Sequence, residues 1–191
     1  MADLRADVIK IEPPGGQETR KVGPFLKDEE HPERSLYFWH YNTSKRGVTL
    51  DITLPEGQEV FKKLAATATL ILESFPAGYL PSIGLGYEAL SENNPGLIMC
   101  SVTPFGQDGP WRDYKTTDLL HLAAGGQMAS SGYDVEDIPD APPIAPGGGN
   151  AWHIASHYAY IGIMGALYHR DFTGEGQYID VSAHEACSLT T

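Results

Sequence analysis

The chain has few basic residues for its number of acidic ones. Its 191 residues include 13 lysines and arginines against 25 aspartates and glutamates, which gives a formal net charge of −12. A protein with this charge repels nucleic acids and anionic membrane surfaces. We therefore expect neither a nucleic acid nor a membrane among its partners. An anionic ligand would have to be held by a small basic cluster or by backbone N–H groups.

Cysteines and long apolar runs are also scarce. The two cysteines, Cys100 and Cys187, lie far apart and form no Cys-x-x-Cys pair. This usage is more typical of a reducing, cytoplasmic setting than of a disulfide scaffold. Residues 1–5 lack the apolar core of a signal peptide, and the most apolar window, 154–167, is too short to span a bilayer. The sequence thus predicts a soluble, cytoplasmic protein.

Short apolar segments alternate with helical patterns along the chain. Alternation and apolar runs predict strands at 7–12, 48–52, 69–73, 97–102 and 177–181. Helical patterns predict helices at 55–64, 87–92, 118–130 and 151–170, and a capping-box start for another at 182–185. Polar or glycine-rich segments predict loops at 17–35, 103–117 and 132–149. Because helices separate successive strands, the expected fold class is α/β, with a parallel sheet and right-handed crossovers.

The longest predicted helix follows three consecutive glycines, Gly147, Gly148 and Gly149. Asn150 is placed to cap its first turn. Apolar positions at 154–168 spread around the helix, so we expect it to be buried on several sides. A flexible loop that leads into a helix N-terminus presents free N–H groups, which suits an anionic ligand. The alternative is a glycine linker before a core helix, which requires no ligand.

Five sequence motifs occur in the order that one enzyme family shows. They are ADVIKIE at 6–12, NTSKRGVTLD at 42–51, ESF at 73–75, SVTPFGQDGP at 101–110 and TGEGQYIDVS at 173–182. Together they resemble the class III CoA-transferases, the family that also contains the α-methylacyl-CoA racemases. The resemblance covers nearly the whole chain, and five ordered motifs make it far more specific than a single glycine pattern.

The resemblance implies a Rossmann-like parallel sheet with flanking helices, the large domain of a class III CoA-transferase. Residues 1–191 would form part of that domain, without its first strand and without the C-terminal small domain, because family chains are considerably longer. Coenzyme A and acyl-CoA would enter as substrates together with a carboxylic acid, and no tightly bound cofactor is expected. The protein partner would be a second subunit, in an interlocked homodimer or in a heteromer with a paralogous subunit.

In this family an aspartate carboxylate attacks the acyl-CoA thioester, and a mixed anhydride and then an enzyme–CoA thioester form. Counting back from the motif at 174–177 places that aspartate at Trp152, and a small shift reaches Asn150 or His153. None of these is a carboxylate. Asp118 is the best placed alternative, in a segment where family members bring a second polar group into the site. The simpler interpretation of Asp118 is a helix N-terminal residue stabilised by the helix dipole.

The missing aspartate leaves two other interpretations. The chain could be a non-nucleophilic CoA-binding subunit beside a catalytic paralogue, or a divergent CoA enzyme with different chemistry. A racemase would need a His/Asp pair, and Thr117 stands where the racemases have histidine, which argues against that activity. His153, at the glycine end of the long helix, is a candidate acid or base.

The resemblance also implies contacts with CoA. Leu50 and Phe75 match positions that line the CoA site, and Ser74 lies in a turn that resembles a segment touching the nucleotide. Many relatives carry a basic residue directly after that phenylalanine to meet a phosphate, whereas Pro76 stands here. This turn therefore has the residues expected to line the CoA site but lacks the basic residue expected to meet a phosphate.

Positive charge near the expected CoA site is offered by Lys45 and Arg46, although basic residues beside a strand are often only solvated. His153 and His157 have the four-residue spacing of helical metal ligands. A third ligand would have to be recruited from elsewhere, such as His121, so no metal site is predicted.

Overall fold

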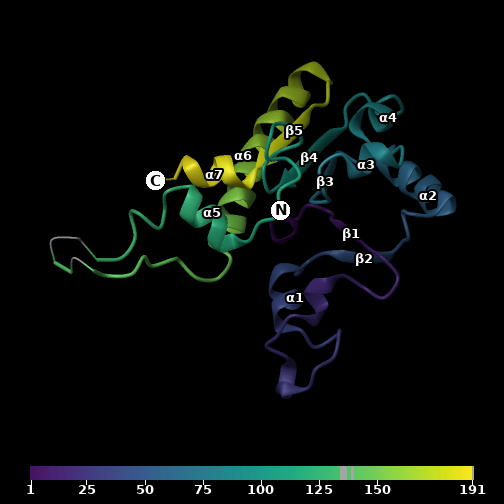
Figure 1. Cartoon of the computed structure of the whole chain (residues 1–191). Helices are drawn as coiled ribbons and strands as arrows, with labels where there is room; N and C mark the ends of the chain where they lie inside the picture. The colour runs from purple at the N-terminus through teal and green to yellow at the C-terminus, as the bar shows by residue number, and fades with distance from the viewer. Residues whose placement is uncertain (134–136, 139, 191) are drawn as a thin grey trace. The chain divides into compact units, whose positions relative to one another are not determined.

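The computed structural model describes residues 1–133, 137–138 and 140–190 (Figure 1). The chain divides into two compact units, Met1–Lys63 and Leu64–Thr191. The loop predicted at 132–149 falls partly outside the described residues. Among the helices that are described, none has the length and apolar content that crossing a membrane requires.

The first unit is built on two parallel strands. Its elements are η1 (Ala2–Leu4), β1 (Ile9–Glu12), η2 (Glu18–Lys21), η3 (Leu26–Asp28), α1 (Leu36–Tyr41) and β2 (Arg46–Thr49). The strands β1 and β2 pair with Ile9 opposite Arg46 and Glu12 opposite Thr49. The segment 17–35, predicted as a loop, contains the two short 3₁₀ helices η2 and η3.

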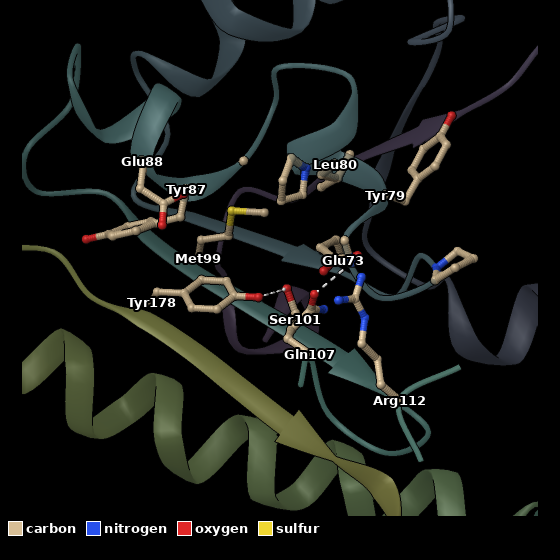
Figure 2. Close-up of a pocket in the computed structure, with 14 residues that line it drawn as sticks. Glu73, Tyr79, Leu80, Tyr87, Glu88, Met99, Ser101, Gln107, Arg112 and Tyr178 are labelled. Carbon is tan, nitrogen blue, oxygen red and sulfur yellow. Dashed lines mark hydrogen bonds between the residues drawn. The ribbon is translucent and has the colours of Figure 1, made fainter. Parts of the chain in front are cut away.

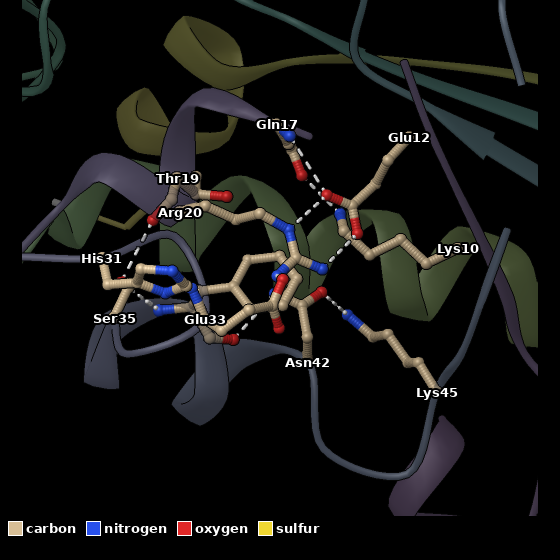
Figure 3. Close-up of polar contacts among 11 residues, drawn as sticks. Lys10, Glu12, Gln17, Thr19, Arg20, His31, Glu33, Ser35, Asn42 and Lys45 are labelled. Atoms are coloured by element: carbon tan, nitrogen blue, oxygen red, sulfur yellow. Dashed lines mark hydrogen bonds and ion pairs between the residues drawn. The ribbon is translucent and has the colours of Figure 1, made fainter. Parts of the chain in front are cut away.

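A buried ion pair holds the segment that follows β1. Glu12 is 6% exposed, and its carboxylate accepts hydrogen bonds from Arg20 Nε at 2.7 Å and from Arg20 Nη2 at 2.9 Å (Figure 3). The backbone N–H of Gln17 donates to the same carboxylate at 3.0 Å. The Arg20 guanidinium also lies over the ring of Phe38 in α1, 3.8 Å from its centroid. Because Arg20 compensates its charge, the first unit can bury the carboxylate of Glu12, while Arg20 stays partly exposed.

The second unit contains a three-stranded parallel sheet. The boundary between the units falls within α2 (Pro55–Ala65). The elements after α2 are β3 (Leu70–Glu73), α3 (Tyr79–Ser82), α4 (Tyr87–Ser91), β4 (Ile98–Thr103), α5 (Asp118–Ala124), α6 (Asn150–Thr173), β5 (Tyr178–Ser182) and α7 (Ala183–Ser188). The strand order is β3-β4-β5, and Glu73, Ser101 and Asp180 lie in one row across it. The predicted α/β class with parallel strands is confirmed.

Helix α6 packs on one face of this sheet through small side chains. Its buried positions are Ala151, Ala155, Ala159, Ile163 and Ala166. Of these, Ala159 and Ile163 pack against side chains of β4 and β5. The prediction that this helix is buried on several sides is wrong, because Ile161 and Tyr168 are 63% and 69% exposed. Alanines at four of the five buried positions allow the helix backbone to pack closely, while Ile161 and Tyr168 lie on its outer surface.

Two helix boundaries differ from the predictions. The N-cap of α6 is Gly149, which has a left-handed conformation (φ 75°), whereas Asn150, the predicted cap, is the first helical residue. Helix α5 ends at Ala124, before two glycines, although the helical pattern extended to 130. A glycine pair favours an early end because glycine loses more backbone entropy in a helix than other residues.

Two helices were absent from the predictions. Helix α1 begins after Ser35, whose Oγ accepts a hydrogen bond from the Phe38 N–H at 3.0 Å. The aromatic run that forms α1 gave no clear helical period, so this capping serine was its only local signal. Helix α3 is a single turn that follows Gly78 in left-handed conformation.

Candidate functional site

The Asp118 carboxylate lies at the N-terminus of α6. Asp118 is the first residue of α5, and the N-cap of that helix, Thr117, accepts a hydrogen bond from the Leu120 N–H at 3.4 Å. Asp118 Oδ1 accepts a hydrogen bond from the backbone N–H of Ala151 at 2.8 Å. A negative charge at this point is stabilised by the free N–H groups and by the dipole of α6. The structure thus brings Asp118 next to the helix start at which the family aspartate was expected.

The glycine run before α6 is open. Gly147 and Gly148 are exposed, and a Cβ atom on either would meet no atom within 4 Å. Gly148 and Gly149 have positive φ angles of 80° and 75°, which glycine adopts without strain. The described residues therefore do not close this loop. His153, on the first turn of α6, is exposed, and its backbone carbonyl oxygen lies 2.7 Å from Nδ1 of His157.

Aromatic rings surround Phe105, in the loop between β4 and α5. Its ring centroid lies 5.2 Å from that of His121 and 5.6 Å from that of His184, and the two imidazole centroids are 6.0 Å apart. The ring of Trp111 lies 5.4 Å from His184, and the ring of Trp152 lies 5.2 Å from His121. These five residues, the Phe105 cluster, connect α5, α6 and α7 with the loop after β4.

His121 is the most deeply buried member of the Phe105 cluster. It has no exposed surface, and neither of its ring nitrogens has a hydrogen-bond partner among the described residues. Burial lowers the pKa of His121, the imidazole of His184 lowers it further, and the carboxylate of Asp118 opposes both. The ring is therefore kept neutral near pH 7. Within the described part of the chain, no three His, Cys, Asp or Glu side chains are grouped to hold a metal ion.

A cleft of about 250 Å³ opens on the face of the sheet opposite α6. Side chains of a strand point alternately to its two faces. In β4, Cys100 and Val102 therefore face α6, whereas Met99 and Ser101 face this cleft. Figure 2 shows Glu73 from β3, Met99 and Ser101 from β4, and Tyr178 from β5 along it, with Arg112 from the loop after β4 nearby. The cleft therefore lies beside the turn in which the CoA contacts Ser74 and Phe75 were predicted.

Hydrogen bonds connect the polar side chains of this cleft. The Tyr178 hydroxyl donates to Ser101 Oγ at 2.9 Å, and the Phe75 N–H donates to Glu73 Oε2 at 2.7 Å. Burial raises the pKa of Glu73, hydrogen bonds from Ser101 and Phe75 oppose this rise, and the charge of Asp180 adds to it. Burial raises the pKa of Asp180 as well. Both carboxyl groups hold a proton more readily than an exposed one.

Arg112 reaches the turn that follows β3. Its Nη2 donates to the backbone carbonyl of Ala77 at 3.0 Å, next to Pro76. Ser74 and Phe75 are exposed in the same turn. No local pattern predicts this role for Arg112, because its position depends on the loop after β4 folding back onto the turn after β3.

The other predicted CoA contacts, Lys45, Arg46 and Leu50, belong to the first unit. Arg46 is paired with Asp7, with Nη2 at 2.6 Å from Oδ2 and Nε at 2.9 Å from Oδ1. Lys45 Nζ donates to the backbone carbonyl of Tyr41 at 2.7 Å and has no carboxylate partner among the described residues. Leu50 is half-buried, directly after β2. Of the two predicted basic residues, Arg46 is held in an ion pair with Asp7, whereas Lys45 interacts electrostatically with Asp3 without a described ion pair.

Comparison with known proteins places this arrangement in a family. The family model described as CoA-transferase family III matches residues 1–191. The chain is 40% identical over 185 residues to subunit BbsE of the succinyl-CoA:(R)-benzylsuccinate CoA-transferase of Thauera aromatica, which covers 97% of this chain and 44% of the relative. It is 38% identical over 189 residues to the beta subunit of the succinyl-CoA–L-malate CoA-transferase of Chloroflexus aurantiacus, with 97% and 44% covered.

A solved structure shows the same fold. The CAIB/BAIF family protein from Brucella suis matches with a TM-score of 0.86 and 37% sequence identity, over 96% of this chain and 47% of that chain. The chain spans less than half the length of these relatives. The match of the family model along all 191 residues agrees with the parallel sheet and the ordered motifs, and the chain belongs to CoA-transferase family III.

Proposed function

We propose that this chain takes part in a CoA-transferase reaction, in which CoA passes from an acyl-CoA thioester to a carboxylic acid. The observation that carries the proposal is the Asp118 carboxylate at the N-terminus of α6, in a chain that belongs to this family over its whole length. The two similar subunits are named for succinyl-CoA, with (R)-benzylsuccinate in one case and L-malate in the other. Succinyl-CoA with a dicarboxylic acid is accordingly the first substrate pair to test.

In this proposal the Asp118 carboxylate is the nucleophile. One of its oxygens attacks the thioester carbonyl carbon, the CoA thiolate leaves, and a mixed anhydride forms. The thiolate then attacks the Asp118 carbonyl carbon, which releases the donor acid and leaves an Asp118–CoA thioester. The acceptor carboxylate attacks that thioester and again expels CoA thiolate. The thiolate takes the acceptor acyl group from the second anhydride, and the Asp118 carboxylate is restored without consumption of water.

The surroundings of Asp118 support this role physically. Each attack creates an oxyanion, which backbone N–H donors stabilise if they are fixed in advance. The open glycine run and the first turn of α6 present such donors next to Asp118. The hydrogen bond from the Ala151 N–H fixes the direction of the carboxylate and leaves Oδ2 as the oxygen that attacks.

A second candidate function is that of a CoA-binding subunit without a nucleophile of its own. Asn150, Trp152 and His153 stand where the family carboxylate is expected, and both relatives described above are themselves subunits. In this case Asp118 only caps α6, and a paralogous subunit supplies the nucleophile.

The partner differs between the two functions. A nucleophilic chain would work in an interlocked homodimer, and a chain without a nucleophile would need a heteromer with its paralogue. For both we propose a reducing, cytoplasmic setting, in keeping with Cys100 and Cys187, which are buried and free.

Trapping of the enzyme-bound intermediate tests the proposal. The protein is incubated with succinyl-CoA and hydroxylamine, digested and analysed by mass spectrometry, because hydroxylamine converts an aspartyl anhydride or thioester into a stable hydroxamate. Under the first function the hydroxamate forms at Asp118, is lost in Asp118→Asn, and persists in the control Asp113→Asn. An unmodified chain that still binds CoA supports the second function, and a chain that binds no CoA overturns both.

A further inference from the structure

The first unit contains a cleft of its own, of about 170 Å³. Its lining comes from β1, η2, α1 and the segment before β2, and includes Lys10, Gln17, Thr19, Tyr37, Asn42 and Lys45. Figure 3 shows Lys10 and Lys45 coming from two elements, Lys10 toward the side chain of Gln17 beside the Glu12–Arg20 pair and Lys45 toward that of Asn42. Segments that are distant in the sequence thus bring two ammonium groups to one small cleft.

The charge of this cleft is not balanced by its own lining. None of the residues that line it carries a carboxylate. Of the acidic groups that act on the two lysines, Glu12 is already engaged by two nitrogens of Arg20 and by the Gln17 N–H, and Asp3 acts on Lys45. Neither Lys10 nor Lys45 has a carboxylate ion pair among the described residues. In a chain with a net charge of −12, this cleft is a local exception with a surplus of positive charge.

The cleft also contains unused hydrogen-bond donors. An ammonium group has three N–H donors. Lys45 Nζ donates to the Tyr41 carbonyl at 2.7 Å and to Asn42 Oδ1 at 3.0 Å, and Lys10 Nζ donates to Gln17 Oε1. Each lysine therefore keeps at least one donor without a described acceptor. Thr19 Oγ1 is buried and has no hydrogen-bond partner among the described residues.

Electrostatics favour an anion at this place. Burial lowers the pKa of Lys10, Glu12 opposes this shift, and the charges of Lys45 and Arg20 add to it. Burial lowers the pKa of Lys45 too, and the charge of Asp3 opposes this shift. An anion between the two ammonium groups would stabilise the charged form of both. Lysine is suited to this because its charge is compact and its donors rotate freely.

We propose that this cleft binds a phosphoryl group, held by Lys10 and Lys45 with the Thr19 hydroxyl as a further donor. A phosphoryl group has three free oxygens in a tetrahedral arrangement, so it can meet donors from three directions, whereas a carboxylate has two oxygens in one plane. A water molecule takes about 30 Å³ of liquid, and the cleft has room for a group several times larger. The inference stands on this cleft alone and does not require the proposed transfer reaction.

Phosphate could reach the cleft free in solution or as part of CoA. Isothermal titration of the protein with inorganic phosphate, CoA and dephospho-CoA, at constant ionic strength, distinguishes these sources. We expect Lys10→Gln and Lys45→Gln each to weaken phosphate binding about ten-fold, since each removes a charge-assisted contact. The control Lys21→Gln removes the same charge from an exposed pair with Glu18 and should leave the affinity unchanged.

The titrations distinguish three cases: binding of CoA, binding of free phosphate, and no phosphate site. A loss of affinity for CoA in both variants, together with weaker binding of dephospho-CoA to the unaltered protein, identifies the 3′-phosphate of CoA as the occupant. A loss that is confined to inorganic phosphate identifies free phosphate. Equal affinity in both variants and the control, or no phosphate binding by the unaltered protein, overturns the inference. Lys45 lies at the exposed rim, so Lys45→Gln tests the cleft even if replacing the half-buried Lys10 disturbs folding.

Discussion

The carboxylate of Asp118 and the backbone N–H of Ala151 are hydrogen-bonded at 2.8 Å, although 33 positions separate them in the sequence. Helix α6 starts after Gly149, which has no side chain with which to cap it. Asp118 supplies from another helix the acceptor that a capping residue would supply locally. One hydrogen bond therefore fixes the starts of α5 and α6 together and orients the candidate nucleophile.

Removal of this acceptor should destabilise the second unit. We expect Asp118→Ala to lower the free energy of unfolding by about 1 kcal/mol, the usual cost of losing a cap. Asp118→Asn keeps an oxygen that can accept the Ala151 N–H and should cost less. Urea denaturation measures both, with Asp113→Ala as the control, since the Asp113 side chain is 87% exposed. Equal stability of Asp118→Ala and the control would show that the bond does not hold α6.

The elements that could be predicted from the sequence depend on local patterns. A strand is predicted at 97–102, and β4 (Ile98–Thr103) forms there with its residues almost all buried. The helix start predicted at 182–185 is confirmed, because α7 begins after Ser182, whose Oγ accepts a hydrogen bond from the Glu185 N–H at 3.2 Å. Gly174 ends α6 in left-handed conformation, as its position after the helical pattern indicates.

The candidate site could be predicted only in part, because its geometry depends on contacts between distant segments. Asp118 was identified as a candidate, but its partner Ala151 carries no side-chain signal at all. The Phe105 cluster joins residues of a loop and three helices, and no spacing in the sequence relates them. The outer face of α6 resembles a core face because it carries large apolar side chains such as Ile161 and Tyr168, whereas contacts with the sheet are made by Ala159 and Ile163.

The buried His121 should make stability depend on pH. Its pKa in the folded chain is lowered from the usual value of 6.5, so the unfolded chain binds a proton more readily. The stability that neutral His121 contributes is therefore complete above pH 6.5 and is lost as the pH falls toward the lowered pKa. Urea denaturation between pH 5 and 8 should show this loss, and His121→Phe should make the curve flatter.

The replacement by phenylalanine has a second expected result. An apolar ring of similar size removes two buried nitrogens without described partners, so its effect at pH 7.5 should be small or stabilising. His40→Phe, at an exposed position of α1, is the matched control and should leave the pH dependence unchanged. If the free energy of unfolding of His121→Phe fell with pH as steeply as that of the unaltered chain, another group would cause the loss of stability at low pH.

Two glycines of the second unit should respond to alanine in opposite directions. A Cβ atom on Gly176 would lie 1.9 Å from the backbone oxygen of Leu97, so Gly176→Ala should lower stability by about 2 kcal/mol or more. Gly165 lies on the exposed side of α6, where a Cβ atom meets nothing within 4 Å. Gly165→Ala should raise stability by about 0.8 kcal/mol through helix propensity. Thermal unfolding of both variants measures the difference, and a shift in the same direction would contradict it.

The buried pair of Glu12 and Arg20 should respond differently to single and double replacement. Arg20→Met leaves a carboxylate that is 8% exposed without its partner, so we expect a loss of about 3 kcal/mol. The double variant Glu12→Leu with Arg20→Met removes both charges and should recover most of that loss, because apolar side chains can replace a buried pair at little cost. Lys21→Met, which breaks the exposed pair with Glu18, is the control and should have little effect.

The pH dependence of the same variants gives an independent test. The hydrogen bond from Arg20 lowers the pKa of Glu12 below its usual value of 4.5, with burial opposing it. The pair therefore contributes stability above pH 4.5, and this contribution is lost as the pH falls through the lowered pKa. In Arg20→Met the lone carboxylate gains from protonation, so acid should destabilise this variant less than the unaltered chain. Urea denaturation at pH 4 and pH 7 should therefore show a smaller difference in Arg20→Met, and an equal difference would place the acid sensitivity in other carboxylates.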